Sequence, residues 1–266
     1  MRVVEILGPS GVGKTYLYNS LLGMHTQRNY LSVSEACIKA ALHFRPNINF
    51  SRQYLYYLLL KFGIFKSRKL GLANRILAGD AALPDPEAYY RVSINLLKRY
   101  LLTEEDAEVR AVRTKNLNRT IKLNLLLEKY LDGDDLVLFD EGILHHQHGL
   151  SDHLLETYGV EAIGRDRALN PYAVISCELS LEKNIERVKM RRSAGVRTFS
   201  HGHLSDSDLV RYISVNNTAY RMKIDWLKSS GIPVLVLNTE TIQAQHVDAV
   251  HSFINKLAKY DKCKSF

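Results

Sequence analysis

The sequence predicts an α/β fold with a parallel sheet of about five strands and a large helical insertion between the second and third strands. Two observations carry this prediction. Short apolar runs of strand length recur along the chain and are separated by longer segments with helical character. The first apolar run leads directly into a glycine-rich loop and then into a helix-like segment. The 266 residues contain no clear linker, repeat or low-complexity stretch, so we expect one domain over residues 1–266.

Five runs are predicted to form the strands. The first, Val3-Val4-Glu5-Ile6-Leu7, is mostly branched and apolar rather than alternating, which is typical of a strand buried on both faces. The second run is short and ends in polar residues, and Ser34 is expected to cap the helix after it. The five runs cover residues 3–7, 29–35, 136–141, 172–178 and 232–238.

Helices are predicted between and after these strands. The segment 208–229 places apolar side chains on one stripe, at Leu209, Ile213, Tyr220, Ile224 and Leu227. The predicted helices cover residues 16–22, 35–44, 85–102, 103–131, 181–192, 208–229 and 243–260.

Residues 45–131 show no convincing strand. The aromatic run 54–60 has strand-like residues, but its neighbours favour a helix. A mainly helical stretch of this length exceeds what an ordinary crossover between parallel strands needs. We therefore expect 45–131 to be a helical insertion that covers the site and recognises an acceptor.

The loop after the first strand matches the pattern G-x-x-x-x-G-K-[ST], with the sequence Gly8-Pro9-Ser10-Gly11-Val12-Gly13-Lys14-Thr15. Glycines allow the backbone to curl so that successive N–H groups face one anion, and the following helix adds its positive end. In such a loop Lys14 is expected to reach the outer phosphates and the Thr15 hydroxyl to hold Mg²⁺. The alternative is a chance glycine-rich turn between a strand and a helix.

On these residues the chain resembles the P-loop nucleoside triphosphate-binding family. The resemblance implies a parallel sheet with helices on both faces and a triphosphate bound on this loop. The cofactors expected from it are ATP and Mg²⁺. No Asn-Lys-x-Asp sequence or Asp-x-x-Gly at the third strand supports a GTPase.

Asp140 follows the apolar part of the third strand. Ligands of open α/β sheets bind outside the carboxyl ends of the strands, where a carboxylate can organise Mg²⁺. This resembles a Walker B strand, and the alternative is an acid in a strand-ending turn. Glu141 is adjacent, and only one of the two need belong to a metal site.

A narrower resemblance is to deoxynucleoside kinases and nucleoside-monophosphate kinases. It rests on the order of elements: a phosphate loop, a second strand ending in Glu35, a helical region, a third strand ending in acid, and a basic helix with its loop. It implies that Glu35 acts as base on an acceptor hydroxyl; the alternative is a helix-capping or first-turn acid. The chain departs from these families at Asp140-Glu141-Gly142, where no arginine follows the acid. The acceptor, whether nucleoside, nucleotide or sugar, therefore stays open.

Basic residues follow the fourth strand, at Arg187, Arg191, Arg192 and Arg197. Their order resembles the lid of P-loop kinases, placed here at 187–207, in which arginines close on the phosphates. Arg187 and Arg191 are four residues apart and are expected to share a helical face. Phosphoryl transfer needs such positive charge. The alternative is a solvated basic helix end.

Histidines cluster after Asp140, at 145, 146, 148 and 153, and two more lie at 201 and 203. No cysteine is near the cluster, so a complete zinc ligand set is not predicted. Contact with an acceptor and a merely polar helix surface both remain open. The long central helix is basic through Arg110, Arg113, Lys115, Arg119 and Lys122, which a phosphate-rich partner could use. No aromatic residues interleave with them as in a single-strand-binding platform. Because a charge run on a helix is usually a solvated face, we prefer that interpretation.

The composition sets the broader limits. A net charge of +8 and a pI near 9.3 favour anionic ligands and permit nucleic acid or an acidic membrane surface. No apolar run approaches the roughly 18 residues of a membrane span. The three separated cysteines and the lack of a secretory signal indicate a reducing, cytoplasmic compartment. The sequence gives no indication of oligomeric state.

The sequence thus favours an ATP-dependent phosphotransferase that transfers the γ-phosphate to a small-molecule acceptor. The first alternative is a P-loop ATPase or a nucleotide-gated regulatory or binding protein. The second, suggested only by the charge, is a kinase acting on nucleic-acid ends.

Overall fold

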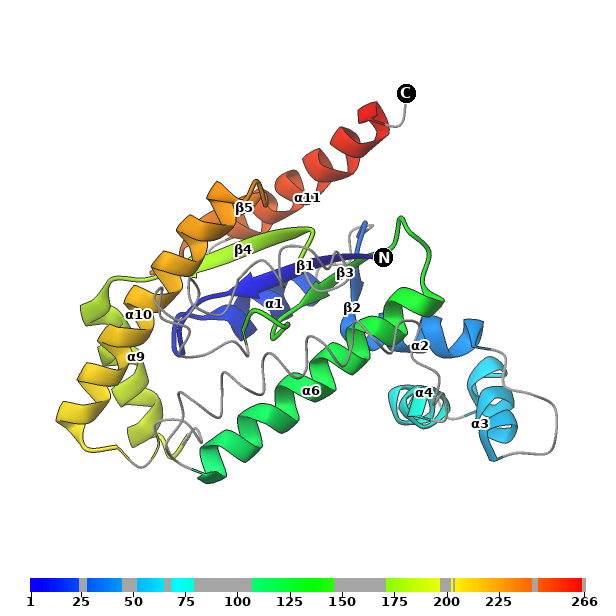
Figure 1. Ribbon diagram of the computed structural model, residues 1–266, viewed down its shortest axis with the longest axis horizontal. Coiled ribbons are helices and arrows are strands. Elements are labelled where there is room, and N and C mark those ends of the chain that lie inside the picture. Colours follow the sequence, from blue (N-terminus) through cyan, green and yellow to red (C-terminus); the bar gives the residue numbers. More distant parts are fainter. Residues whose placement is uncertain are drawn as a thin grey trace.

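In the computed structural model, the described residues are 1–23, 28–44, 52–64, 68–78, 107–145, 171–196, 202, 204–240 and 244–264. Within these ranges, five strands form one sheet in the order β2-β3-β1-β4-β5 (Figure 1). Every neighbouring pair is parallel. The predicted α/β fold with a parallel sheet of five strands is therefore confirmed. The strands are β1 Arg2–Leu7, β2 Leu31–Ser32, β3 Leu136–Phe139, β4 Ala173–Glu178 and β5 Val234–Asn238.

The central strand β1 pairs with β3 on one side and with β4 on the other. Its buried side chains alternate between the two faces: Val4 and Ile6 belong to one hydrophobic cluster, and Val3 and Leu7 belong to others. A strand covered on both faces explains why the run carries no polar alternation. Because all strands are parallel, the loop that follows β1 lies at the carboxyl edge of the sheet.

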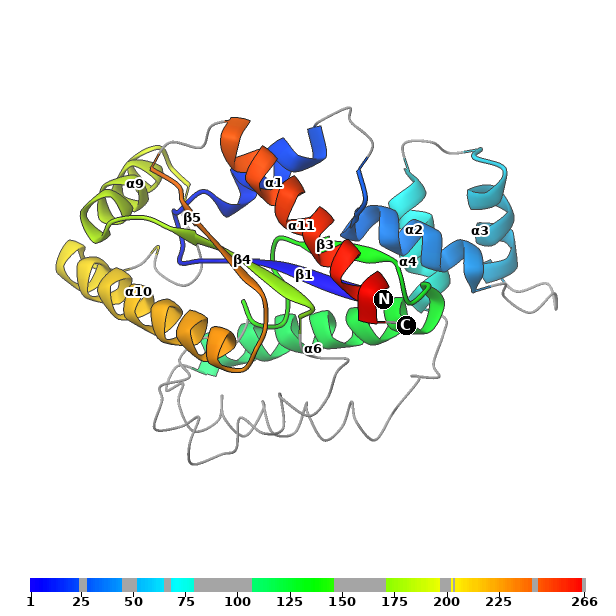
Figure 2. The same ribbon diagram turned by 90° about the horizontal axis from the view of Figure 1, so that it is seen from above.

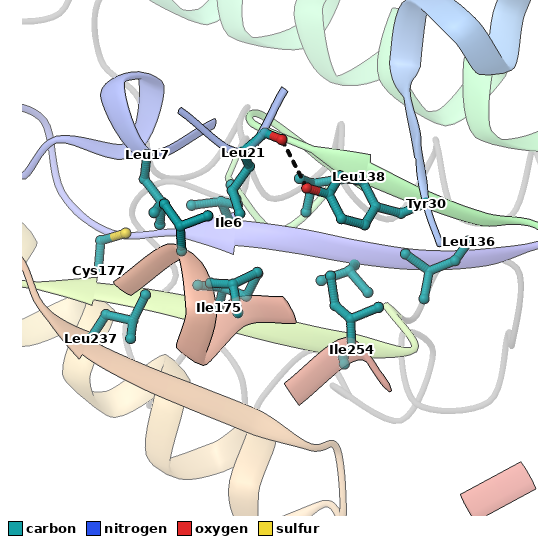
Figure 3. Close-up of a cluster of buried hydrophobic side chains, with 14 of the residues drawn as sticks. Ile6, Leu17, Leu21, Tyr30, Leu136, Leu138, Ile175, Cys177, Leu237 and Ile254 are labelled. Atoms are coloured by element: carbon teal, nitrogen blue, oxygen red, sulfur yellow. Dashed lines mark hydrogen bonds between the residues drawn. The ribbon is translucent and has the colours of Figure 1, made fainter. Parts of the chain in front are cut away.

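Helices cover both faces of the sheet. Figure 2 shows α1 and α11 on one face, and α6 and α10 on the other. Figure 3 shows the first of these layers, in which Leu17 and Leu21 of α1 and Ile254 of α11 pack over Ile6 and Ile175. The helices are α1 Lys14–Gly23, α2 Val33–His43, α3 Arg52–Lys61, α4 Lys69–Ala78, α6 Ala107–Tyr130, α9 Leu181–Ser193, α10 Asp206–Ser229 and α11 Ala244–Lys264.

The stripe predicted on 208–229 lies on α10. All five of its apolar residues are buried. Three of them, Tyr220, Ile224 and Leu227, pack with Leu7 of β1 and Val174 of β4. The other two pack against Val188 of α9. The stripe thus holds α10 against the face of the sheet to which Leu7 and Val174 contribute.

The second strand is shorter than predicted. Instead of 29–35, only Leu31–Ser32 is extended, and α2 begins at Val33. The reason is a capping box: Ser32, not Ser34, is the N-cap, and its hydroxyl accepts from the Glu35 N–H while the Glu35 carboxylate accepts from the Ser32 N–H. Glu35 is therefore a first-turn helix residue and does not end a strand.

In the region 45–131, the regular elements among the described residues are helices α3, α4 and α6. The aromatic run 54–60 is helical within α3, as its neighbours predicted. The helix expected over 85–102 lies outside the described residues. The limits of an insertion over 45–131 and its role in acceptor recognition stay predictions. None of the helices in the described part of the chain combines the length and apolar character that a bilayer crossing requires.

Candidate functional site

The glycine-rich loop joins the end of β1 to the start of α1, and Figure 1 shows β1 running towards α9 and α10 at this end. Its glycines allow unusually close packing. Gly8 has φ 147°, and a Cβ there would lie 2.5 Å from the carbonyl oxygen of Cys177 in β4. Gly11 has φ 88°, and a Cβ there would lie 2.7 Å from Val188 of α9. The loop therefore lies directly on β4 and α9, where larger residues would push it away.

Two backbone carbonyl groups of the loop accept hydrogen bonds from side chains of α9 and of the segment after β5. Asn184 of α9 donates to the Ser10 carbonyl at 2.8 Å, and Thr239, just after β5, donates to the Val12 carbonyl at 2.6 Å. Asn184 is fully buried and accepts in turn from Asn217 of α10 at 3.0 Å. The sequence analysis missed all three residues. The one available signal was position, because Thr239 follows a strand at the carboxyl edge of the sheet.

Lys14 is only 8% exposed although it lies in the first turn of α1. Its ammonium donates to the carbonyl oxygens of Gly8 at 2.7 Å and Pro9 at 3.0 Å. Burial lowers the pKa of Lys14, while the nearby carboxylates of Asp140 and Glu141 raise it. Lys14 therefore places a positive charge against the loop, near the carboxylates of Asp140 and Glu141.

The structure brings Thr15 and Asp140 together. The Thr15 hydroxyl donates to Oδ2 of Asp140 at 3.0 Å. The other oxygen, Oδ1, is buried and has no hydrogen-bond partner among the described residues. Burial raises the pKa of Asp140, whereas the Thr15 hydrogen bond and the charge of Lys14 lower it. A buried carboxylate oxygen without a donor is costly unless a cation or water meets it.

These side chains suit a Mg²⁺ ion that is also held by water and phosphate better than a metal ion whose ligands all come from the protein. Mg²⁺ takes oxygen ligands and is usually held by one or two side chains together with waters and substrate phosphates. Thr15 supplies a hydroxyl, and Asp140 supplies a carboxylate with one oxygen that has no hydrogen-bond partner in the described part of the chain. Across the described ranges, no group of three or more His, Cys, Asp or Glu side chains is arranged to hold a metal ion.

A cavity of about 510 Å³ opens over the loop. The loop side of its wall is formed by residues between Ser10 and Tyr16. The volume is within the range of small-molecule sites. The opposite side comes from the segment after β3 and from α9 and α10, through Glu141, His145, Arg191, Tyr212, Asn216 and Tyr220.

The three arginines predicted to act together are separated by the structure. Arg191 lines the cavity. Arg187 instead donates to the carbonyls of Thr239 and Glu240, and weakly to that of Val12 at 3.5 Å. Arg192 points to Asp206 at the start of α10, at 3.4 Å. Arg187 and Arg191 were expected to act from one helical face. They do not, because the Arg187 side chain binds backbone carbonyls of the loop and of the segment after β5, whereas Arg191 lines the cavity.

The remainder of the predicted lid, 187–207, comprises the end of α9 and the start of α10 together with a stretch outside the described residues. Arg197, His201 and His203 lie in that stretch.

Glu35 is not among the residues that line the cavity over the loop. Its carboxylate is engaged by Ser32 and by Arg28, whose guanidinium donates at 2.9 Å. Burial raises the pKa of Glu35, but the hydrogen bonds from Ser32 and the charge of Arg28 outweigh it, so the net shift is downward. A lowered pKa and full engagement make this side chain a weak proton acceptor.

Of the predicted histidine cluster, His145 lies at the cavity wall. Its Nε2 is 3.7 Å from the Glu141 carboxylate, and its Nδ1 is 3.4 Å from the Tyr220 hydroxyl. His146, His148 and His153 lie outside the described residues.

A second cavity, of about 260 Å³, lies between the start of α2, the end of β3 and the face of α6. It is lined by Val33, Asn116, Arg119, Thr120, Leu123, Phe139 and Glu141. Glu141 therefore borders both cavities. Arg119, which the sequence analysis interpreted as part of a solvated basic face, is one of the lining residues.

Comparison with protein-family models and with curated proteins finds no match to this chain.

Proposed function

We propose that this protein is an ATP-dependent phosphotransferase that uses Mg²⁺ and transfers the γ-phosphate to a small-molecule acceptor. The observation that carries the proposal is the pair formed by Thr15 and Asp140 beside Lys14, on a loop that matches the phosphate-binding pattern. At a helix N-terminus lie a hydroxyl, a buried cation and a carboxylate, one oxygen of which has no hydrogen-bond partner within the described ranges. This is the set of groups that a metal–triphosphate complex requires.

Each residue of this set has a distinct task in the proposal. The N–H groups of the loop and of the first turn of α1 would cradle the phosphates. Lys14 would exchange the Gly8 and Pro9 carbonyls for phosphate oxygens, and Arg191 would add positive charge from the facing wall. Thr15 and Asp140 would hold Mg²⁺, which supplies charge neutralisation when bound. Asn184, Thr239 and Arg187 would keep the loop in shape.

The second cavity supports a transferase rather than a simple ATPase. It shares Glu141 with the cavity over the loop, so a molecule bound there would lie next to the phosphates. Arg119 and Asn116 give it a cation and an amide for recognition of a polar acceptor. Glu141 is exposed at this border and is better placed than Glu35 to take a proton from an acceptor hydroxyl.

The test is ATP consumption by the purified protein with Mg²⁺, alone and with pooled nucleosides, nucleotides, sugars and short oligonucleotides. Products are followed by mass. Phosphate in a small acceptor supports the proposal and identifies the acceptor class. Release of free phosphate whatever the pool contains would indicate an ATPase or nucleotide-gated switch instead. A phosphorylated oligonucleotide end would indicate the polynucleotide kinase.

A further inference from the structure

Glu5 is a carboxylate in the middle of the central strand, and it is only 2% exposed. A buried charge is costly unless hydrogen bonds compensate it. Its two oxygens accept from consecutive backbone N–H groups after β3: Oε2 from Leu144 at 3.1 Å and Oε1 from His145 at 2.6 Å. Gly142 completes the fit, because a Cβ at that position would overlap the Glu5 carboxyl group.

Lys223 of α10 holds the same segment from the other side. Its ammonium donates to the Leu144 carbonyl at 2.8 Å and lies 5.1 Å from the centre of the Tyr220 ring. Leu144 is therefore gripped through both of its backbone polar groups, the N–H by β1 and the carbonyl by α10. Its side chain is buried at 1% exposure among apolar residues from β1, β4 and α10.

The charges of Glu5 and Lys223 support each other. Burial raises the pKa of Glu5 to about 7, while the N–H groups of His145 and Leu144 and the charge of Lys223 oppose the rise. Burial lowers the pKa of Lys223 to about 8, and Glu5 opposes that fall. Loss of either partner therefore leaves the other charge less well compensated.

The gripped segment is part of the wall of the candidate site. His145, at its end, and Glu141, just before its start, both line the cavity over the loop. Neither Glu5 nor Lys223 lines this cavity. We propose that Glu5 and Lys223 are positioning residues, which clamp the 142–145 backbone and thereby set the place of Glu141 and His145 beside the phosphate loop.

The clamp is tested first by amide hydrogen exchange, which needs no turnover. Glu5→Gln keeps the size of the side chain but puts an N–H₂ group against one of the two N–H donors. We expect exchange at Leu144 and His145 to become about tenfold faster or more, because one amide loses its acceptor. Exchange in β4 and α11 should stay as in the wild type. Unchanged exchange at Leu144 and His145 would overturn the clamp.

Lys223→Met provides a second variant if Glu5→Gln does not fold, and Lys228→Met at the exposed end of α10 is its control. We expect faster exchange in Lys223→Met and wild-type exchange in Lys228→Met. Lys223→Arg keeps a donor and should restore much of the protection. Equal exchange in the Met variants at positions 223 and 228 would contradict the proposal.

The positioning role rests on the proposed function and has a separate readout. The phosphate loop is held by Asn184 and Thr239 rather than by the 142–145 segment. Glu5→Gln and Lys223→Met are therefore expected to change the affinity for Mg²⁺-ATP less than threefold while kcat falls about tenfold or more. Faster exchange with unchanged kcat would make the clamp merely structural and overturn the positioning role. If the wild type turns over no ATP, the proposed function fails, and the exchange result still decides the clamp.

Discussion

The Thr15 hydroxyl donates a 3.0 Å hydrogen bond to Oδ2 of Asp140, 125 residues further along the chain. The two residues meet because β1 and β3 are parallel neighbours, with Glu5 opposite Phe139 in the register. The residues that follow these two strands therefore lie at the same edge of the sheet. The bond engages one Asp140 oxygen and leaves the other, buried, without a partner among the residues described. We interpret this oxygen as the protein's side of a Mg²⁺ site.

Asp140→Asn should remove the Mg²⁺ dependence of ATP binding. The amide keeps the size of the side chain but loses the charge that a divalent cation needs. We expect calorimetry to show that the variant binds ATP about tenfold or more weakly than the wild type in Mg²⁺, and that the affinity changes little in EDTA. Because burial already raises the pKa of Asp140, the neutral variant should be no less stable than the wild type near neutral pH. Asp225→Asn, on the exposed side of α10, is the control. Retained Mg²⁺ dependence in Asp140→Asn would contradict the assignment.

Substitution of the three arginines by alanine should give three different results. Arg191→Ala should weaken ATP binding or turnover by roughly tenfold with little loss of stability, because this side chain lines the cavity. Arg187→Ala should lower the free energy of unfolding by about 1–3 kcal/mol, since its carbonyl partners after β5 lose a donor. Arg192→Ala loses a surface ion pair with Asp206 and should change stability by less than about 1 kcal/mol. Denaturant unfolding and ATP titration distinguish these outcomes, and equal effects of all three would argue for a shared role in a lid.

Glu35→Gln and Glu141→Gln separate the two candidate acceptor-side bases. Glutamine at N3 preserves a capping box, so Glu35→Gln should retain the fold. We expect it to keep kcat within about threefold, whereas Glu141→Gln should lower kcat by roughly 10²-fold. The measurement is turnover with the acceptor identified by mass. A large loss of kcat in Glu35→Gln with an intact fold would restore Glu35 as the base.

The pair formed by buried Glu5 and half-buried Lys223 predicts an unusual pH dependence of stability. The folded pKa of Glu5 is about 7 against an ordinary 4.5, so the folded state binds more protons between these values and the free energy of unfolding falls as the pH rises from 4.5 to about 7. The folded pKa of Lys223 is about 8 against 10.5, so stability recovers as the pH rises from about 8 to 10.5. Besides each other, the titratable residues in contact with this pair include Tyr220, whose ring centre lies 5.1 Å from the Lys223 ammonium, and His145, whose backbone N–H binds Glu5.

Urea unfolding at several pH values tests this dependence. Relative to Glu5→Gln, the wild type should lose roughly 1–3 kcal/mol across the range in which Glu5 ionises. The slope above about pH 8 should persist in Glu5→Gln and disappear in Lys223→Met. Parallel profiles of wild type and Glu5→Gln below neutral pH would mean that Glu5 titrates normally.

The sheet and the loop could be predicted because their signals are local. Apolar runs mark the buried strands, and the pattern from Gly8 to Thr15 marks the turn between β1 and α1. The stripe on α10 was equally visible, since each of its residues faces the core at helical spacing. The second strand was overestimated because Tyr30 and Val33 have strand propensity, while the capping box of Ser32 and Glu35 decided the backbone.

The contacts behind the site depend on topology rather than local pattern. Glu5 meets Leu144 and His145, about 140 residues away, only because β1 and β3 lie side by side. The sequence placed Glu5 in a strand buried on both faces, but it gave no indication of the groups that its carboxylate would meet. In the same way, spacing placed Arg187 and Arg191 on one helical face. The carbonyls that accept from Arg187 lie just after β5, 52 and 53 residues later in the chain, and local spacing could not predict them.

The most direct measurement of the central claim is the affinity of Mg²⁺-ATP for the wild type, Lys14→Ala and the control Lys228→Ala. Lys14 is the cation of the loop, and its present partners are two loop carbonyls that survive its removal. The account predicts binding to the wild type and to Lys228→Ala, and at least about a hundredfold loss in a folded Lys14→Ala. Equal affinity of all three proteins would show that the triphosphate does not use this loop, and the phosphotransferase assignment would fall with it.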